Sequence, residues 1–173
     1  MRFALILFLS LFPVITYAEV QAGDQAVYDL TGYNFGTQTA SLTRIVTAVD
    51  PANDKIYFQD ILFFNGQTTM NEETSLISVQ NSYDQSTTSE SECTRLVSSH
   101  ESGKWVTTSY EQQTVLGQTL NTCHAHIVMT GADGAITTED AWIGMVPFGS
   151  VKVLMSGAEA TFGSMTLTSF TKN

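Results

Sequence analysis

Residues 40–66 contain two strand-like segments separated by a cluster of turn-forming residues. The first, ASLTRIVTAVD, is rich in Thr, Val and Ile, and the second, KIYFQDILFFNG, ends at an Asn-Gly pair. The residues DPAND between Val49 and Lys55 favour a turn, because Asp, Pro and Asn are common at turn positions. This stretch therefore predicts an antiparallel hairpin.

Short strand-like segments divided by turn residues continue along the whole chain. Gly131-Ala132-Asp133-Gly134, for example, has the composition of a hairpin loop. Besides the hairpin at 40–66, strands are expected at 23–30, 74–81, 104–116, 118–130, 135–145, 150–157 and 160–170. A chain of about nine strands predicts a mainly β fold.

The stretch SESECTRLVSSH, near residues 89–101, breaks this pattern and predicts a helix. Ser89 and Glu92 have the spacing of a capping box, in which each side chain bonds the backbone N–H of the other residue. One apolar stripe then recurs at i, i+3 and i+4, formed by Cys93, Leu96 and Val97. The fold expected is a single curved antiparallel sheet, a half-barrel of about nine strands, with one packed α-helix.

The segment 55–64 is largely apolar on both faces. Successive strand side chains point to opposite sides, which divides it into Ile56, Phe58, Leu62 and Phe64 on one face and Tyr57, Ile61 and Phe63 on the other. Strands that are covered on both faces have this pattern. Either a sheet bent around a helix or a sheet with a ligand cavity on its concave side would provide the cover.

The first eighteen residues, MRFALILFLSLFPVITYA, have the pattern of a secretory signal peptide. Arg2 precedes an apolar run that is shorter than the roughly 20 residues of a membrane-spanning helix. Small residues then precede a cut after Ala18. We therefore expect residues 1–18 to be removed and residues 19–173 to form one β-rich domain that is exported, to the periplasm or the medium, without a transmembrane segment.

The charge of the chain argues against two classes of partner. It has 7 basic and 17 acidic residues, a formal net charge of −10. A surface of this sign repels phosphate backbones and anionic headgroups. Nucleic acid is therefore not an expected partner, and the acidity is explained by solubility.

The stretch TLNTCHAHIVMT, residues 119–130, places a cysteine beside two histidines. On a strand, Cys123 faces one side of the sheet while His124 and His126 face the other. The chain has two cysteines, and in an exported protein such a pair usually forms a disulfide. We therefore expect Cys123 to bridge to Cys93 on the buried face of the helix.

His124 and His126 are weak candidates for metal ligands. A His-x-His pair supplies two ligands, whereas zinc needs a third or a fourth. His100 is the one other histidine in the chain and lies at the end of the expected helix. Two solvent-facing histidines are the alternative, and no metal site is assigned.

Catalytic patterns are absent from the sequence. It contains no Gly-x-Ser-x-Gly elbow, no His-Glu-x-x-His helix and no glycine-rich phosphate loop. We therefore expect no catalytic residues, no cofactor and no enzymatic activity.

Three features in the second half carry a resemblance to known proteins: Cys93 on a short helix, the stretch GQTLNTC at 117–123, and WIGMVPFGSVK at 142–152. Together they resemble a group of uncharacterised exported bacterial β-rich proteins. In that group a Gly-x-x-x-x-Thr-Cys strand precedes a Trp-bearing strand and a Val-Pro-x-Gly-x-Val-Lys turn. Their sheet is similar to the half-barrel of lipoprotein carriers (LolA-like). The resemblance covers roughly residues 89–170 and implies a curved sheet wrapped around helical segments.

The concave face of the sheet is the expected ligand site. Its candidate apolar lining is Phe58, Leu62, Phe64 and Trp142, whose large ring either anchors the core or lines a pocket. The function expected is that of a non-enzymatic envelope protein that binds an apolar or lipid-like ligand. The alternatives are a structural or protein-interaction module of unknown partner and, third, a metal-binding protein that uses His124 and His126.

Overall fold

The computed structural model describes residues 19–98, 105–131, 134–157 and 160–173. The expected signal peptide, residues 1–18, and His100 lie outside the described residues. The strands are β1 Gln25–Thr31, β2 Thr39–Asp50, β3 Lys55–Phe64, β4 Gln67–Leu76, β5 Trp105–Val115, β6 Gln118–Thr130, β7 Ile136–Gly144, β8 Ser150–Gly157 and β9 Ser164–Thr171. The α-helices are α1 Ile77–Ser86 and α2 Glu90–Ser98, and 3₁₀ turns cover Tyr33–Phe35 and Pro51–Asn53.

All nine strands belong to one curved antiparallel sheet in the order β4-β3-β2-β1-β9-β8-β7-β6-β5. This confirms the mainly β prediction. The first and last strands pair with each other in the middle of the sheet, from Gln25 opposite Thr171 to Thr31 opposite Ser164. From β1 the chain runs through consecutive hairpins to β4 at one edge of the sheet. From β5 at the other edge it runs back through consecutive hairpins to β9.

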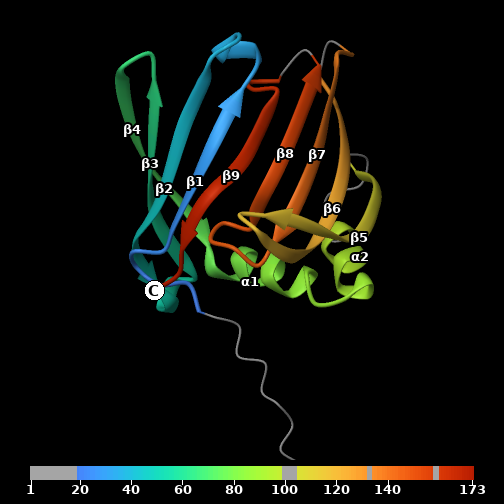
Figure 1. Ribbon diagram of the computed structural model, residues 1–173. Helices are drawn as coiled ribbons and strands as arrows, with labels where there is room; N and C mark the ends of the chain where they lie inside the picture. Colours follow the sequence, from blue (N-terminus) through green and yellow to red (C-terminus); the bar gives the residue numbers. More distant parts are fainter. Residues whose placement is uncertain (1–18, 99–104, 132–133, 158–159) are drawn as a thin grey trace, which may run out of the picture.

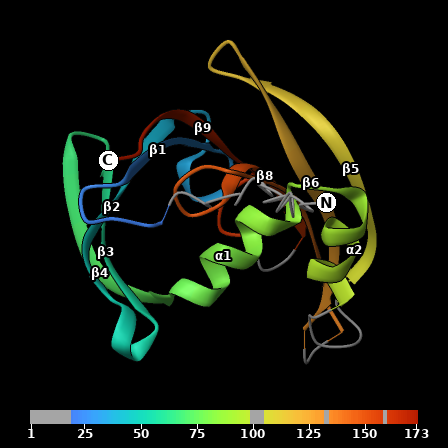
Figure 2. The ribbon, with the colours of Figure 1, turned by 90° about the horizontal axis from the view of Figure 1, so that it is seen from below.

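The two helices join these edges. Figure 2 shows α1 and α2 crossing the concave side of the sheet, between β4 and β5. In Figure 1 they lie at the lower end, and the upper end of the concave face is free of helices. The curved sheet therefore has one half filled by helices and one half that is not.

The second helix corrects the expectation of a single one. Residues 74–81 alternate like a strand, but β4 ends at Leu76 and α1 begins at Ile77. The N-terminus of α1 is capped from a distant turn, because Asp54 accepts hydrogen bonds from the backbone N–H of Ser78 (3.0 Å) and from its hydroxyl (2.6 Å). A cap from 24 residues away leaves no local signal in the sequence.

The expected helix near 89–101 is present as α2, Glu90–Ser98, and residues 99–101 lie outside the described residues. Half of the predicted capping box forms, since the backbone N–H of Glu92 donates to Ser89 Oγ at 3.3 Å. The carboxylate of Glu92 bonds Arg95 instead of the Ser89 backbone. The helix packs on the sheet through Cys93 and Leu96, which are buried with Cys123 and Ile143.

The predicted disulfide joins Cys93 and Cys123, whose Cα atoms are 5.3 Å apart. Cys123 and Ala125 on β6 are buried on the concave side, as the alternation predicted. The bridge therefore fixes α2 to the right-hand half of the sheet in Figure 1.

The faces of β3 are unequal, which corrects the expectation that both are covered. Ile56 and Phe58 are 3% and 5% exposed, whereas Tyr57 and Phe63 on the other face are 37% and 51% exposed. The helices cover the first face, and the second lies on the convex side of the sheet. Neither helix covers Tyr57 and Phe63 on this convex face.

Candidate functional site

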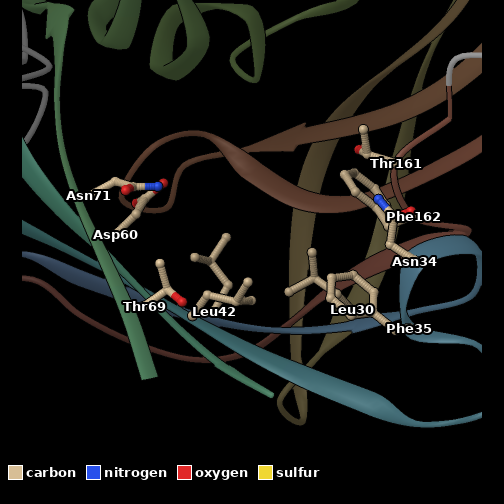
Figure 3. A pocket seen from close by; sticks show the side chains of 10 residues that line it. Leu30, Asn34, Phe35, Leu42, Asp60, Thr69, Asn71, Thr161 and Phe162 are labelled. Atoms are coloured by element: carbon tan, nitrogen blue, oxygen red, sulfur yellow. The ribbon is translucent and has the colours of Figure 1, made fainter. Parts of the chain in front are cut away.

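The upper half of the concave face holds an apolar cavity of about 220 Å³. Its walls are the side chains of Leu30, Phe35, Leu42, Leu62 and Phe162, which come from β1 to β3, the β1–β2 connection and the segment before β9. Polar groups also line it, from Asn34, Asp60, Thr69, Asn71 and Thr161 (Figure 3). The arrangement suits a short apolar group with a polar end.

Of the four residues expected to line a pocket, Leu62 lies at this cavity and the other three lie outside it. Phe64 packs edge-on against Phe35, with ring centroids 5.2 Å apart, and supports the wall from behind. Phe58 lines a separate space of about 160 Å³ under α1, with Val79 and Gln80.

Arg44 and Asp60 lie on the concave face between these two spaces. The guanidinium donates to both carboxylate oxygens, at 2.9 and 2.8 Å, and lies over the rings of Phe58 and Phe148. Burial opposes the charge of Arg44, but the hydrogen bond and the charge of Asp60 outweigh it and raise the pKa of the guanidinium. Asp60 therefore lines the cavity while it forms an ion pair with Arg44.

The turn between β7 and β8 packs against α1. Val146 is fully buried, its carbonyl accepts from Gln80 at 3.4 Å, and the Pro147 carbonyl accepts from the hydroxyl of Tyr28. Gly149 has φ +71°, and a Cβ there would lie 2.6 Å from the ring of Tyr83 on α1. The Val-Pro-Phe-Gly stretch thus holds α1 against the concave face.

Trp142 does not line this site, because it lies on the opposite face of the sheet. It follows the buried Ala141 on β7 and stacks on His124, with centroids 4.3 Å apart and planes 2° apart. Lys152 lies over its ring at 4.9 Å, and Nε1 donates to Glu111 at 2.6 Å. These neighbours cover the ring of Trp142 on the face away from the helices. The composition of the strand alone does not distinguish a Trp covered in this way from a Trp that lines a pocket.

His124 and His126 share the carboxylate of Asp140. His124 Nε2 lies 3.0 Å and His126 Nδ1 2.8 Å from the same oxygen, Oδ1. The two histidines are half-buried and not simply solvent-facing. Burial acts to raise the pKa of Asp140, but the hydrogen bonds of His126 and His124 outweigh it and lower the pKa below its ordinary value.

Within the described residues, no group of three or more His, Cys, Asp or Glu side chains is placed to hold a metal ion. His100, the third histidine considered, lies outside these residues. Both histidines direct a nitrogen at Asp140, which explains the pair without a metal.

Ser109 extends the cluster into a Ser-His-Asp arrangement that the sequence does not reveal. Its Oγ lies 3.4 Å from His124 Nδ1, while His124 Nε2 faces Asp140. Nucleophilic catalysis also needs donors for a developing oxyanion and a place for the substrate. Ser109 lies within the β5–β6 ladder, and neither the cavity on the concave face nor the space under α1 is lined by Ser109, His124 or Asp140. We assign these residues to stabilising contacts between strands.

Across the part of the chain that the structure describes, neither helix has the length and apolar character to cross a membrane. Comparisons with protein-family models, with curated proteins and with solved structures find no match for this chain.

Proposed function

We propose that this is an exported, non-enzymatic envelope protein that holds a short apolar chain in the upper half of its concave face. The apolar cavity of about 220 Å³ at the half of the sheet without helices carries this proposal. Export is supported by the secretory pattern of residues 1–18 and by the Cys93–Cys123 disulfide. A curved sheet with helices on its concave side also agrees with the resemblance to lipoprotein carriers.

The size of the cavity limits the ligand. It lies below the roughly 300–1,000 Å³ of most small-molecule sites. A single acyl chain fits this space better than a two-chain lipid. The polar groups at the cavity are neutral amides and hydroxyls, apart from the paired Asp60, so we expect a neutral or weakly polar end group.

Binding of 1-alkanols of increasing length to residues 19–173 tests the proposal by titration calorimetry. Each methylene that enters the cavity should raise affinity about fourfold, at roughly 0.8 kcal/mol per buried CH₂. The gain should stop once the chain fills the cavity. Alkanoates of the same length should bind more weakly, because the chain carries a net charge of −10.

Leu62 and Ile61 supply a matched pair of variants. They are neighbours on β3, but Leu62 lines the cavity and Ile61 faces the other side of the sheet. Leu62→Trp should fill the cavity and abolish alkanol binding, while Ile61→Trp should leave it unchanged. Equal binding by both variants, or no alkanol binding by the original chain, would instead favour a protein-interaction module without a small ligand.

A further inference from the structure

The edge strand β4 is long, regular and uncovered. Its ten residues pair with β3 without a register shift, from Lys55 opposite Leu76 to Phe64 opposite Gln67. Nine of the ten are exposed, and β3 is its one neighbour in the sheet. In an antiparallel ladder, alternate residues direct their N–H and C=O groups away from the paired strand. One side of β4 therefore presents a row of backbone donors and acceptors.

The other edge of the sheet is protected. Helix α2 packs against β5 and β6 on the concave side, and the Tyr110 hydroxyl of β5 donates to the carbonyl of Thr87, in the link between the two helices, at 2.9 Å. The pairing of β5 with β6 also shifts between Trp105 and Thr107. Proteins commonly protect edges with such cover, with irregular pairing, or with charged side chains and Pro. Strand β4 pairs regularly and contains no Pro or Lys, and its charged residues are Glu72 and Glu73.

The charges of β4 indicate which kind of strand could pair with it. Glu72 and Glu73 lie side by side on opposite faces of the strand and are both exposed. Among the described residues, neither carboxylate lies within ion-pair distance of a cation, although the charge of Glu73 contributes to the raised pKa of Arg44. Antiparallel pairing of two β4 strands would bring four carboxylates together on chains of net charge −10, and like charges on paired strands are destabilising. A second copy of this chain is therefore a poor occupant.

A hollow beside these carboxylates suits a cationic side chain. It measures about 500 Å³ and is lined by Glu72, Glu73 and Thr74 of β4, Tyr57 and Phe58 of β3, and Thr47 of β2. Tyr57 is 37% exposed. Carboxylates beside an aromatic ring attract Lys and Arg by charge and by cation–π contact. On the convex face, Met70 is 62% exposed and offers an apolar contact two residues from Glu72.

We propose that β4 is a docking edge for an extended basic segment of another protein, which adds to the sheet as a tenth strand. The backbone of the segment pairs with β4, and adjacent Lys or Arg residues meet Glu72 and Glu73 on the two faces. An apolar residue two positions from one of these cations packs on Met70. This mode of recognition takes its affinity from the backbone and its selectivity from the side chains.

A blocked ten-residue peptide with a central Lys-Lys pair in a Thr/Val background tests this proposal against residues 19–173. We expect saturable binding by fluorescence anisotropy, and at least tenfold slower hydrogen exchange at β4 amides on binding. A Glu-Glu peptide should bind at least tenfold more weakly, because it meets like charges. The Lys-Lys peptide N-methylated at alternate residues should bind as weakly as the Glu-Glu peptide, because it lacks the backbone donors.

Charge reversal separates the edge from the charge of the whole molecule. The double variant Glu72→Lys/Glu73→Lys should lose Lys-Lys peptide binding at least tenfold and gain binding of the Glu-Glu peptide. Glu19→Lys/Asp29→Lys makes the same change in net charge at two exposed residues away from β4 and should bind within twofold of the original chain.

Three results would overturn the proposal. The first is equal Lys-Lys peptide binding by the two double variants. The second is exchange protection outside β4. The third is a concentration-dependent dimer of the original chain that itself protects β4, which would identify a second copy as the occupant. Binding of the Lys-Lys peptide is measured on the original chain without alkanol, so its result does not depend on whether the alkanol cavity is used.

Discussion

At the scale of single residues, Gly149 shows how closely the β7–β8 turn meets α1. Gly149 and Gly66 have similar left-handed φ values, +71° and +75°. A Cβ at Gly149 would meet Tyr83 at 2.6 Å, whereas a Cβ at Gly66 would have no heavy atom within 4 Å. Gly66→Ala should therefore lower the free energy of unfolding by about 1 kcal/mol from backbone strain alone. Gly149→Ala should lower it by about 2–3 kcal/mol. Urea unfolding measures both, and equal losses would show that α1 does not depend on this contact.

Asp140 gives the stability of the fold a defined dependence on pH. Its pKa is lower in the folded protein than its ordinary value of 3.8. It therefore contributes stability that is present above pH 3.8 and is lost as the pH falls through the lower folded pKa. Asp140→Asn should be less stable than the original chain at pH 7, and this difference should shrink below pH 3.8. Urea midpoints at pH 7 and at pH 3 test this, and a difference that grows in acid would contradict the assignment.

Individual side chains were predictable where the period of a strand decides their direction. The opposite faces of Cys123 and His124 are of this kind, whereas the Cys93–Cys123 bridge was predictable because the chain has two cysteines. Trp142 was not, because alternation divides the residues of β7 into two faces without saying which face is concave. The sharing of Asp140 by two histidines was also hidden, since it depends on the register of β6 against β7.

At the scale of elements, helix α1 could not be predicted from the sequence. Its buried side chains include Gln80, Asp84 and Ser86, so it packs through polar groups and not through an apolar stripe. Ile77 and Val79 are two residues apart, which is the spacing of side chains on one face of a strand. Strand β4 is concealed for the converse reason, because exposure on both faces leaves no alternation over Gln67–Glu73. Helix α2 was predictable, since its cap and its buried stripe are both local.

The disulfide stabilises α2 as an element. By the chain-entropy model, closing a 30-residue loop stabilises the fold by about 3.5 kcal/mol. Cys93→Ala/Cys123→Ala should lose about this much free energy of unfolding in urea. Amides of α2 should then exchange faster, while those of β1 to β3 keep their rates relative to global unfolding. A loss below about 1 kcal/mol would show that packing of Leu96 against Ile143 suffices to hold the helix.

At the scale of the whole molecule, the hairpins could be read from the sequence but their assembly could not. Turn clusters identify neighbours that follow one another in the chain, such as β2 with β3 and β6 with β7. The pairing of β1 with β9 joins residues more than 130 positions apart, and no local signal marks it. The expected half-barrel was thus supported by a resemblance, while its strand order comes from the structure.

The pairing of β1 with β9 also determines when the fold can be completed. During synthesis the N-terminal strands β1 to β4 are made before Ser164–Thr171. The strand in the middle of the finished sheet, β9, is therefore the last to be made. Until then β1 lacks one of its two neighbours, and its buried residues Ala26, Tyr28 and Leu30 lack the cover of Met165 and Leu167. A polypeptide built in this way stays incomplete until its last strand has been made, which would suit the export that we propose for it.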